Sequence, residues 1–269
     1  MTDTSEATQR GAGEIAHGRR LSLGDPESAW GWGTPAGQLR ARRRADLIAS
    51  RARFEPGRRV LEVGCGTGMF TELFAAHGVE LTAVEISADL LARACSRNLP
   101  NVRFLARRFE DCELEGPFEA IVGSSVAHHL DVPGSFRRMH ELLAPGGRIA
   151  FAEPNYLNPQ VFLERHLRFV KPLFWYVSPE ETAFLRWPLA RQLRQAGFED
   201  VAIVPFDWLH PRTPEPLIPA VSAVGRALEA TPLLRELAGS LLITARRPPA
   251  ATEPGERSRP PPGLVPSKG

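Results

Sequence analysis

A nine-residue stretch, Val60-Leu-Glu-Val-Gly-Cys-Gly-Thr-Gly68, decides the fold of this chain. Its apolar residues are typical of a short strand buried on both faces, and its three glycines allow a sharp turn that approaches a ligand closely. The spacing G-x-G-x-G is not the dinucleotide fingerprint, which needs a glycine at position 69, where the chain has Met69. No Lys-Ser or Lys-Thr pair follows, which excludes a phosphate-gripping P-loop. The stretch therefore predicts a strand and a turn that bind a nucleoside-like ligand without a pyrophosphate.

A second apolar run, Leu81-Thr-Ala-Val-Glu85, ends in a carboxylate 17 residues after Gly68. In doubly wound folds, an acid at the tip of the second strand accepts hydrogen bonds from ribose hydroxyls. The alternative is an acid that stabilises the N-terminus of the next helix. Together with the glycine turn, the first interpretation favours a ligand that contains a ribose.

Four motifs follow one another at regular intervals: VLEVGCGTG (60–68), AVEIS (83–87), FEAIVGSSVAHHL (118–130) and LLAPGGRIAFAEP (142–154). With them the chain resembles the class I S-adenosylmethionine (SAM)-dependent methyltransferases, in particular the UbiE-like small-molecule enzymes of the "methyltransferase 11/12" type. The similarity covers roughly residues 55–155 and continues more weakly to about residue 247. It implies a Rossmann-like α/β fold with a seven-stranded, mostly parallel sheet, helices on both faces, an antiparallel last strand and helical lid insertions.

The alternation of strands and helices from residue 59 onward independently predicts a parallel sheet with right-handed crossovers. Strands are expected near residues 59–63, 81–85, 102–105, 119–123, 148–152, 201–205 and 240–246. Helices are expected near residues 34–52, 69–77, 88–97, 134–143 and 192–196. Thr34 before Pro35 predicts a capped helix start, with Leu39, Arg43, Leu47 and Ile48 along one side of that helix. Residues 145–147, Pro-Gly-Gly, are expected to form a turn before the fifth strand.

Composition divides the chain into three parts. Residues 1–29, polar and glycine-rich up to residue 25, are expected to be a flexible N-terminal segment. Residues 30–247 are expected to be the methyltransferase domain, and residues 248–269 a proline-rich disordered tail. Two insertions, 154–187 and 207–236, leave the sheet at the strand ends where ligands bind in open α/β folds, so we interpret them as a lid and a pocket wall. The alternative is packing decoration or an oligomer interface.

The cofactor site that the resemblance implies follows the motifs. The three glycines of the turn lie against the amino-acid and ribose parts of SAM, Glu62 near the methionyl amine, and Glu85 at the ribose. Relatives often carry Gly-Asp-Ala after the third strand, whereas this chain has Arg107-Arg108-Phe109, so Phe109 is expected along the adenine and Glu110 or Asp111 in place of the missing acid. The predicted cofactor-binding residues are Glu62, Gly64, Cys65, Gly66, Gly68, Glu85, Ile86, Phe109, Glu110 and Ser124.

The acceptor side of the site depends on two histidines. Methyl transfer from a sulfonium is an in-line displacement, so the protein must position the reactants, exclude water and remove a proton where the acceptor carries one. His128 and His129 are the candidate general bases, because histidine titrates near neutral pH. The alternative is that one packs and the other only orients the acceptor. Glu153 is the next candidate catalytic residue, orienting an amine or a hydroxyl. Trp30 and Trp32 either close over the ligand or pin the N-terminal segment to the core.

Composition limits the kinds of partner that we expect for this chain. The chain has 269 residues, 43% hydrophobic and 24% charged, with a net charge of +2, which is typical of a globular protein. No apolar run approaches the ~20 residues of a membrane helix, and the start of the chain has no apolar signal core, so we expect a cytoplasmic protein. The three cysteines have no metal-ligand spacing, and no metal is expected. The basic clusters at Arg40–Arg53 and Arg107–Arg108 are interpreted as solvated helix faces rather than a nucleic-acid footprint.

Three functions remain open. The first is a methyltransferase that acts on an O, N or C atom of a small organic metabolite. The second is a methyltransferase that acts on RNA or protein and uses the basic clusters for docking. The third is a SAM-binding protein without catalytic activity. The chain lacks the Asn-Pro-Pro-Tyr motif of base-modifying amino-methyltransferases and the Pro-Cys nucleophile of cytosine or uracil C5 chemistry, which favours a small organic acceptor. A homodimer is an open alternative to a monomer.

Overall fold

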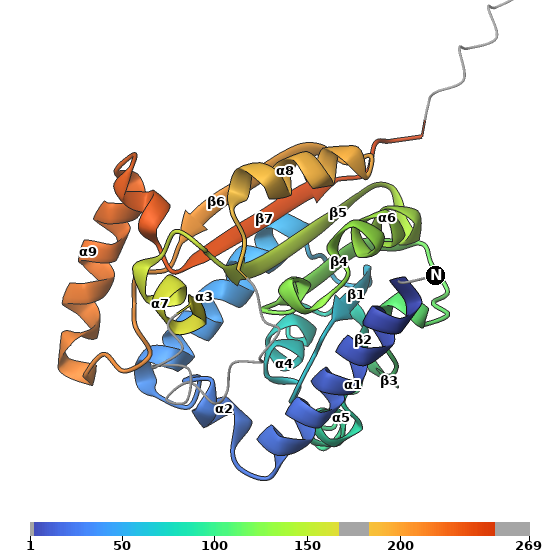
Figure 1. Ribbon diagram of the computed structural model, residues 1–269, viewed down its shortest axis with the longest axis horizontal. Helices are drawn as coiled ribbons and strands as arrows, with labels where there is room; N and C mark the ends of the chain where they lie inside the picture. Colours follow the sequence, from blue (N-terminus) through green and yellow to red (C-terminus); the bar gives the residue numbers. More distant parts are fainter. Residues whose placement is uncertain (1–2, 167–182, 251–269) are drawn as a thin grey trace, which may run out of the picture.

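One sheet of seven strands forms the centre of the computed structural model, which describes residues 3–166 and 183–250 (Figure 1). The strand order is β3-β2-β1-β4-β5-β7-β6. The strands are β1 (Arg59–Val63), β2 (Glu80–Glu85), β3 (Val102–Ala106), β4 (Phe118–Ser124), β5 (Leu143–Pro154), β6 (Glu199–Phe206) and β7 (Ser240–Arg246). β7 pairs antiparallel with both β5 and β6, whereas the other pairs are parallel. The predicted topology, with only the last strand reversed, is confirmed.

Helices cover both faces of this sheet, as predicted. The helices among the described residues are α1 (Asp3–Ser22), α2 (Pro26–Ala29), α3 (Pro35–Ala52), α4 (Met69–Ala75), α5 (Ala88–Cys95), α6 (Val132–Leu142), α7 (Pro159–His166), α8 (Arg186–Gln195) and α9 (Ile218–Ala230). One buried apolar cluster joins the sheet to α6 and α8, and a second joins it to α3 and α4. Because both faces of the sheet are covered, β1 is buried from Val60 to Val63 without alternation.

Register brings the ends of the central strands to one edge. Val63 pairs with Val84 across β1 and β2, and Ser124 pairs with Ala152 across β4 and β5. The residues that follow these strands therefore gather at the carboxyl edge of the sheet, where open α/β folds bind ligands.

Helix α3 begins as predicted, but its fully buried face shares only Ile48 with the predicted one. Thr34 caps it, since its hydroxyl accepts a hydrogen bond from the Gly37 amide at 2.9 Å. Leu39 is 45% exposed. The buried face consists of Ala36, Gly37, Ala41, Arg44, Ala45, Ile48, Ala49 and Ala52. Small residues let the helix approach the sheet closely, so they occupy the buried stripe and the larger leucine turns away.

Two other elements start earlier than expected. β5 begins at Leu143, which pairs with Phe118 of β4. The predicted turn at 145–147 therefore lies inside this strand, where the register of its pairing with β4 shifts. α8 extends back to Arg186 because Leu189 and Leu193, one turn apart, are both buried against the sheet.

A flexible segment was expected at residues 1–29, and the structure forms helices over most of the described part of it. α1 and α2 form there, and α1 lies along α5 in Figure 1. A Cβ at Gly18 would lie 2.5 Å from the Ser87 hydroxyl, so the glycine allows a close helix contact. Glycine, which we interpreted as a sign of disorder, is here a packing residue.

Parts of three predictions lie outside the described residues: residues 1–2 of the N-terminal segment, residues 167–182 of the first insertion and residues 251–269 of the tail. In the described part of the first insertion, Asn155 and Phe184 form a bridge, and α7 follows β5. In the second insertion, α9 stands away from the sheet (Figure 1). Within the described ranges, no helix is both long and apolar enough to cross a bilayer.

Candidate functional site

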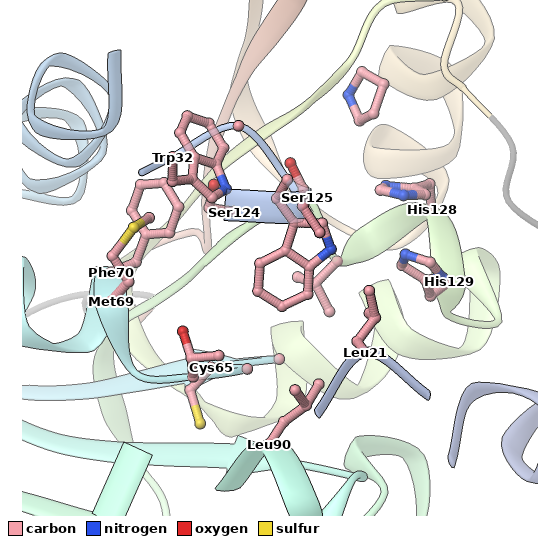
Figure 2. A pocket seen from close by; sticks show the side chains of 18 of the residues that line it. Leu21, Trp32, Cys65, Met69, Phe70, Leu90, Ser124, Ser125, His128 and His129 are labelled. Carbon is pink, nitrogen blue, oxygen red and sulfur yellow. The ribbon is translucent and has the colours of Figure 1, made fainter. Parts of the chain in front are cut away.

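A cavity of about 800 Å³ opens at the carboxyl edge of the sheet. Its wall combines the glycine turn, the ends of β2 and β4, helix α1, the tryptophan segment before α3, α7 and the loop after β6. Figure 2 shows Cys65 and Leu90 on one side of this pocket, His128 and His129 on another, and Trp32 beside Phe70 on a third. Segments distant in sequence thus converge on one site.

The glycine turn carries a backbone conformation that other residues rarely adopt. Gly64 and Gly66 have φ angles of +68° and +54°, and both line the pocket. A Cβ at Gly64 would lie 2.2 Å from a methyl carbon of Val126. Gly68 instead lies behind the pocket, where a Cβ would meet Ala94 at 2.9 Å. Its role in the structure is to let α4 and α5 pack closely, which differs from the predicted cofactor contact.

Glu85 is held at the tip of β2 by backbone amides. Its Oε2 accepts from the Gly66 amide at 2.9 Å, and its Oε1 accepts from the Ser87 amide at 2.8 Å. Burial raises the pKa of Glu85, and these amides offset part of that rise. Ile86 follows it in the pocket wall. The carboxylate therefore ties the glycine turn to β2 and keeps acceptor capacity on each oxygen.

Glu62 is the most unusual carboxyl of the site. It is 1% exposed, and its Oε2 has no hydrogen-bond partner among the described residues. Burial raises its pKa to about 8, although the Thr71 hydroxyl acts in the opposite direction. Glu62 lies two residues before Gly64 and does not reach the pocket wall. Cys65, in the turn, lines the pocket as a thiol, because burial and the charges of Glu62 and Glu85 raise its pKa well above the ordinary value.

The region expected at the adenine contains both predicted residues. Phe109 is 3% exposed and lines the pocket. Glu110 also lines it, and its carboxylate accepts from the Asp131 amide at 3.2 Å and lies 3.3 Å from Arg108. Asp111, the alternative acid, lies outside the pocket wall and pairs with Arg108.

His128 and Glu153 form a buried pair at the end of β4 and β5. The Nδ1 of His128 lies 2.6 Å from Oε2 of Glu153, and both side chains are 1% exposed or less. Oε1 of Glu153 accepts from the amides of Val126 and Ala127 at 3.0 and 2.9 Å. Burial raises the pKa of Glu153, but the His128 contact and these amides outweigh it and hold the pKa below its ordinary value. The carboxylate is thus ionised and holds His128, which lines the pocket.

His129 stacks on His128 and contacts helix α1. The ring centroids are 4.2 Å apart, and Nδ1 of His129 lies 3.0 Å from Oε1 of Glu14. Both histidines line the pocket. The alternative interpretation required one of them to pack away from it, and neither does. Glu153, by contrast, is fully buried behind His128 and does not line the pocket.

Two arginines of α3, Arg40 and Arg44, line the same pocket, and their place there was not predicted from the sequence. Arg44 is 3% exposed and Arg40 pairs with Asp207, so the interpretation of this basic run as a solvated face is wrong for these two residues. Both guanidinium carbons lie 5.2 Å from the centre of the Trp32 ring. The spacing of Arg44 relative to Ala41, Ala45 and Ile48 places it on the buried helix face, and a helical-wheel reading would have found it.

The structure therefore brings most predicted site residues together. Those that line the pocket are Gly64, Cys65, Gly66, Glu85, Ile86, Phe109, Glu110, Ser124, His128 and His129. Glu62, Gly68 and Glu153 lie behind the wall. Trp30 and Trp32 both line the pocket. The residues that were missed come from α1, α3 and the loop after β6, which carry no motif. Within the described residues, no three His, Cys, Asp or Glu side chains gather so as to hold a metal ion.

Known proteins resemble this chain in sequence and in fold. The sequence model of a family described as "Methyltransferase domain" matches residues 37–203. A demethylmenaquinone methyltransferase of Mycolicibacterium gilvum is 30% identical over 183 residues, which cover 61% of this chain and 78% of that protein. A ubiquinone biosynthesis O-methyltransferase of Xanthomonas campestris pv. campestris is 32% identical over 118 residues, 42% of this chain and 49% of that protein, so the chain spans about half the length of this relative.

A solved structure of similar fold holds both a cofactor product and an acceptor. It is the 1,6-didemethyltoxoflavin-N1-methyltransferase of Burkholderia thailandensis with bound 1,6-didemethyltoxoflavin and S-adenosylhomocysteine. The TM-score is 0.58 at 18% identity, with 90% of each chain covered. At this identity the similarity establishes the fold alone.

Proposed function

We propose that the chain transfers the methyl group of SAM to an O, N or C atom of a small organic acceptor, because it belongs to the methyltransferase family whose sequence model it matches. The observation that carries the proposal is the meeting of two parts in one pocket. The glycine turn bound to Glu85 forms one wall, and the buried pair His128–Glu153 supports another.

The residues of the pocket fit SAM. Gly64 and Gly66 leave the turn without side chains where a Cβ would fill space. Glu85 presents carboxylate oxygens suited to ribose hydroxyls, and Phe109 presents an apolar surface suited to adenine. The unpartnered Oε2 of Glu62 suits a cationic amine close behind the turn. When bound, SAM supplies a methyl group activated by the adjacent positive sulfur.

The chain's own residues then position and deprotonate the acceptor. The ionised Glu153 accepts a hydrogen bond from Nδ1–H of His128, which leaves Nε2 as the basic nitrogen of the ring. Nε2 of His128 takes the proton of an acceptor hydroxyl or amine, and Glu153 stabilises the resulting imidazolium. Trp30, Trp32 and helix α1 exclude water from the pocket that they line.

A small acceptor agrees better with the pocket than a macromolecule does. Arg40 and Arg44, from the basic run that was considered as a docking surface, are engaged inside the pocket wall. A docking surface for RNA needs exposed basic side chains that reach phosphates. The comparison with quinone-pathway relatives points in the same direction.

Turnover tests the proposal. Purified protein is incubated with methyl-labelled SAM and a panel of phenols, amines and carboxylic acids, and the transfer of label is measured by mass spectrometry. We expect transfer to at least one acceptor, and the Glu153→Gln variant is expected to lose about 10²- to 10⁴-fold in rate because His128 loses its orienting carboxylate. SAM binding without transfer to any acceptor, or unchanged turnover in Glu153→Gln, would contradict the catalytic role.

A further inference from the structure

An acid of helix α2 holds the glycine turn from outside the pocket. Thr67, in the turn, is 4% exposed and lines the pocket, whereas Glu27 and Arg97 do not line it. The Thr67 hydroxyl donates to Oε1 of Glu27 at 2.7 Å. The same oxygen accepts from Nη2 of Arg97, which follows α5, and Nε of Arg97 donates to the Thr67 carbonyl at 2.8 Å. These three residues form a closed set of hydrogen bonds around the turn.

Glu27 also fixes the tryptophan segment that precedes α3. Its backbone carbonyl accepts from the Trp32 amide at 2.7 Å, and Trp30 is the residue that caps the end of α2. A Cβ at Gly66 would lie 3.7 Å from the Trp30 ring, so this ring lies against the glycine turn. Both tryptophans line the pocket. One residue outside the pocket therefore joins the turn to the rings beside it.

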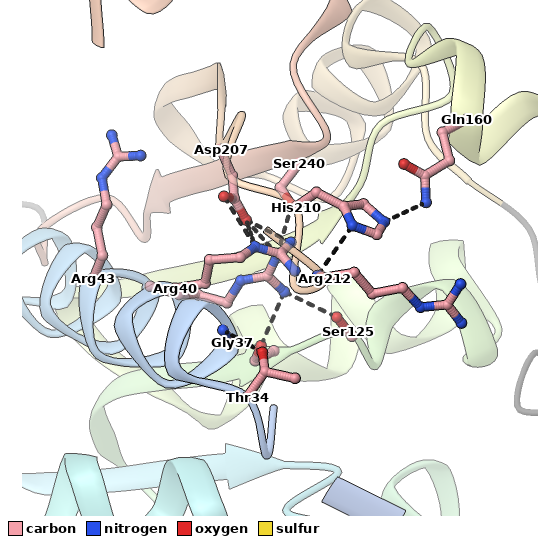
Figure 3. Close-up of polar contacts among 12 residues, drawn as sticks. Thr34, Gly37, Arg40, Arg43, Ser125, Gln160, Asp207, His210, Arg212 and Ser240 are labelled. Carbon is pink, nitrogen blue, oxygen red and sulfur yellow. Dashed lines mark hydrogen bonds and ion pairs between the residues drawn. The ribbon is translucent and has the colours of Figure 1, made fainter. Parts of the chain in front are cut away.

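The far end of the tryptophan segment has a separate attachment. Figure 3 shows Thr34 at the start of α3, and its hydroxyl donates to the Pro211 carbonyl at 2.6 Å. A Cβ at Gly31 would lie 2.8 Å from the Pro211 ring, so the segment packs closely on the loop after β6. The segment is thus attached to α3 at one end and depends on Glu27 at the other.

The contact at Glu27 is polar and partly open to solvent. The side chains of Glu27 and Arg97 are 30% and 23% exposed, and of the four residues of α2 only Pro26 is buried. Ion pairs with this exposure add little to stability, and segments that bury few apolar side chains open locally at low cost. The contact can therefore break and re-form while the sheet stays folded.

We infer that Glu27 is a positioning residue of the cofactor site, which sets the glycine turn through Thr67 and brings Trp30 over it. This inference rests on the proposed function and concerns the same site. Glu27 acts through these two residues, because it does not itself line the pocket. With the contact closed, Trp30 excludes water from the cofactor, and with the contact open, α2 moves from the turn and the cofactor exchanges.

Calorimetric titration of S-adenosylhomocysteine into the wild type, Glu27→Ala and Glu72→Ala tests the inference without turnover. Glu72 of α4 is the matched control, because its carboxylate binds the same Arg97, is 56% exposed and has no contact with Thr67 among the described residues. We expect binding at least about tenfold weaker in Glu27→Ala and unchanged in Glu72→Ala. Equal affinity in all three proteins, or an equal loss in both variants, would overturn the inference.

Hydrogen exchange separates positioning from a general effect on the fold. S-adenosylhomocysteine should slow amide exchange in residues 25–33 of the wild type and of Glu72→Ala, but not of Glu27→Ala at a concentration that saturates it. Protection of these amides in Glu27→Ala equal to that in the wild type would overturn the inference. Failure of the wild type to bind S-adenosylhomocysteine would instead reject the proposed function.

A double variant shows whether Glu27 acts through the turn. Thr67→Val removes the hydroxyl that Glu27 accepts from and keeps the shape of the side chain. The losses of S-adenosylhomocysteine affinity in Glu27→Ala and Thr67→Val should be less than additive in the double variant, because both remove one contact. Fully additive losses would show that Glu27 acts on the cofactor by another route, which would overturn the inference.

Discussion

Three buried carboxyl groups show how the same residue type takes on different roles at the residue scale. Glu85 and Glu153 each accept two backbone amides, and Glu153 has in addition the ring of His128. Glu62 lacks a partner on one oxygen. Their pKa values follow these contacts: burial raises that of Glu62 to about 8 and also raises that of Glu85, while the contacts of Glu153 hold its pKa below the ordinary value.

The raised pKa of Glu62 predicts a stability that falls with pH. Between its ordinary value of 4.5 and about 8, this group is protonated in the folded protein and ionised in the unfolded chain. The free energy of unfolding of the ligand-free protein therefore decreases across this range, by on the order of several kcal/mol from this group. Glu62→Gln cannot ionise, so urea unfolding at pH 5 and pH 8 should show a smaller decrease in that variant. Glu80→Gln, at the exposed start of β2, is the control and should behave like the wild type. Equal decreases in all three proteins would show that Glu62 does not have a raised pKa.

The contact between Glu153 and His128 predicts the state of the ring. With Nδ1–H donating to an ionised carboxylate, His128 should titrate at a higher pH in the wild type than in Glu153→Gln, because the substitution removes the negative charge beside the ring. Nuclear magnetic resonance of ¹⁵N-labelled histidine measures this directly and requires no acceptor. If His128 titrates at the same pH in both proteins, Glu153 does not tune the proposed base.

At the element scale, helix α1 is the part of the site that the sequence did not predict. It carries no motif, and its glycines indicated a flexible segment. The structure uses them for contact: Gly11 and Gly18, two turns apart, face Ile86 and Ser87 beside the cofactor half of the pocket. Whether a glycine loosens a helix or lets it pack closely depends on its neighbour in space, which one sequence does not contain.

Two glycines of α1 provide a matched pair of variants. A Cβ at Gly18 would lie 2.5 Å from the Ser87 hydroxyl, which caps α5, whereas a Cβ at Gly13 would have nothing within 4 Å. Gly13→Ala should stabilise the protein by up to about 1 kcal/mol through helix propensity. Gly18→Ala should destabilise it by about 1 to 2 kcal/mol, since either the cap or the helix must move. Thermal unfolding measures both, and hydrogen exchange should be faster in α1 of Gly18→Ala only. Stabilisation by both substitutions would show that α1 does not pack against α5 in solution.

At the scale of the whole molecule, the order of motifs predicted the sheet and its reversed last strand. The predicted strand ends are good to within about two residues for β1 to β4, because buried strands and glycine turns are local signals. The arginine cluster was not predictable in the same way, since Arg40 and Asp207 are 167 residues apart and meet only in the folded chain. Leu39 of α3 was assigned to the wrong face because small buried alanines give little hydrophobic signal.

The pocket as a whole should also stabilise the fold when it is filled. A ligand that binds only the folded protein raises the free energy of unfolding by about 2.7 kcal/mol at 100 times its dissociation constant. S-adenosylhomocysteine should therefore raise the melting temperature progressively with concentration. Adenosine alone should do so less, because it lacks the amino-acid part that is expected to lie against the glycine turn. An unchanged melting temperature at millimolar S-adenosylhomocysteine would indicate that the pocket does not accept the cofactor product.

Calorimetric titration of S-adenosylhomocysteine into the wild type, Glu85→Ala and Glu80→Ala tests the central claim most directly. The two variants remove the same side chain from the two ends of β2, one in the pocket and one exposed. We predict binding to the wild type and to Glu80→Ala with similar affinity, and binding at least about tenfold weaker to Glu85→Ala, because two charge-assisted hydrogen bonds are lost. Equal affinity in all three proteins, or no binding to the wild type, would contradict the assignment of this pocket to SAM.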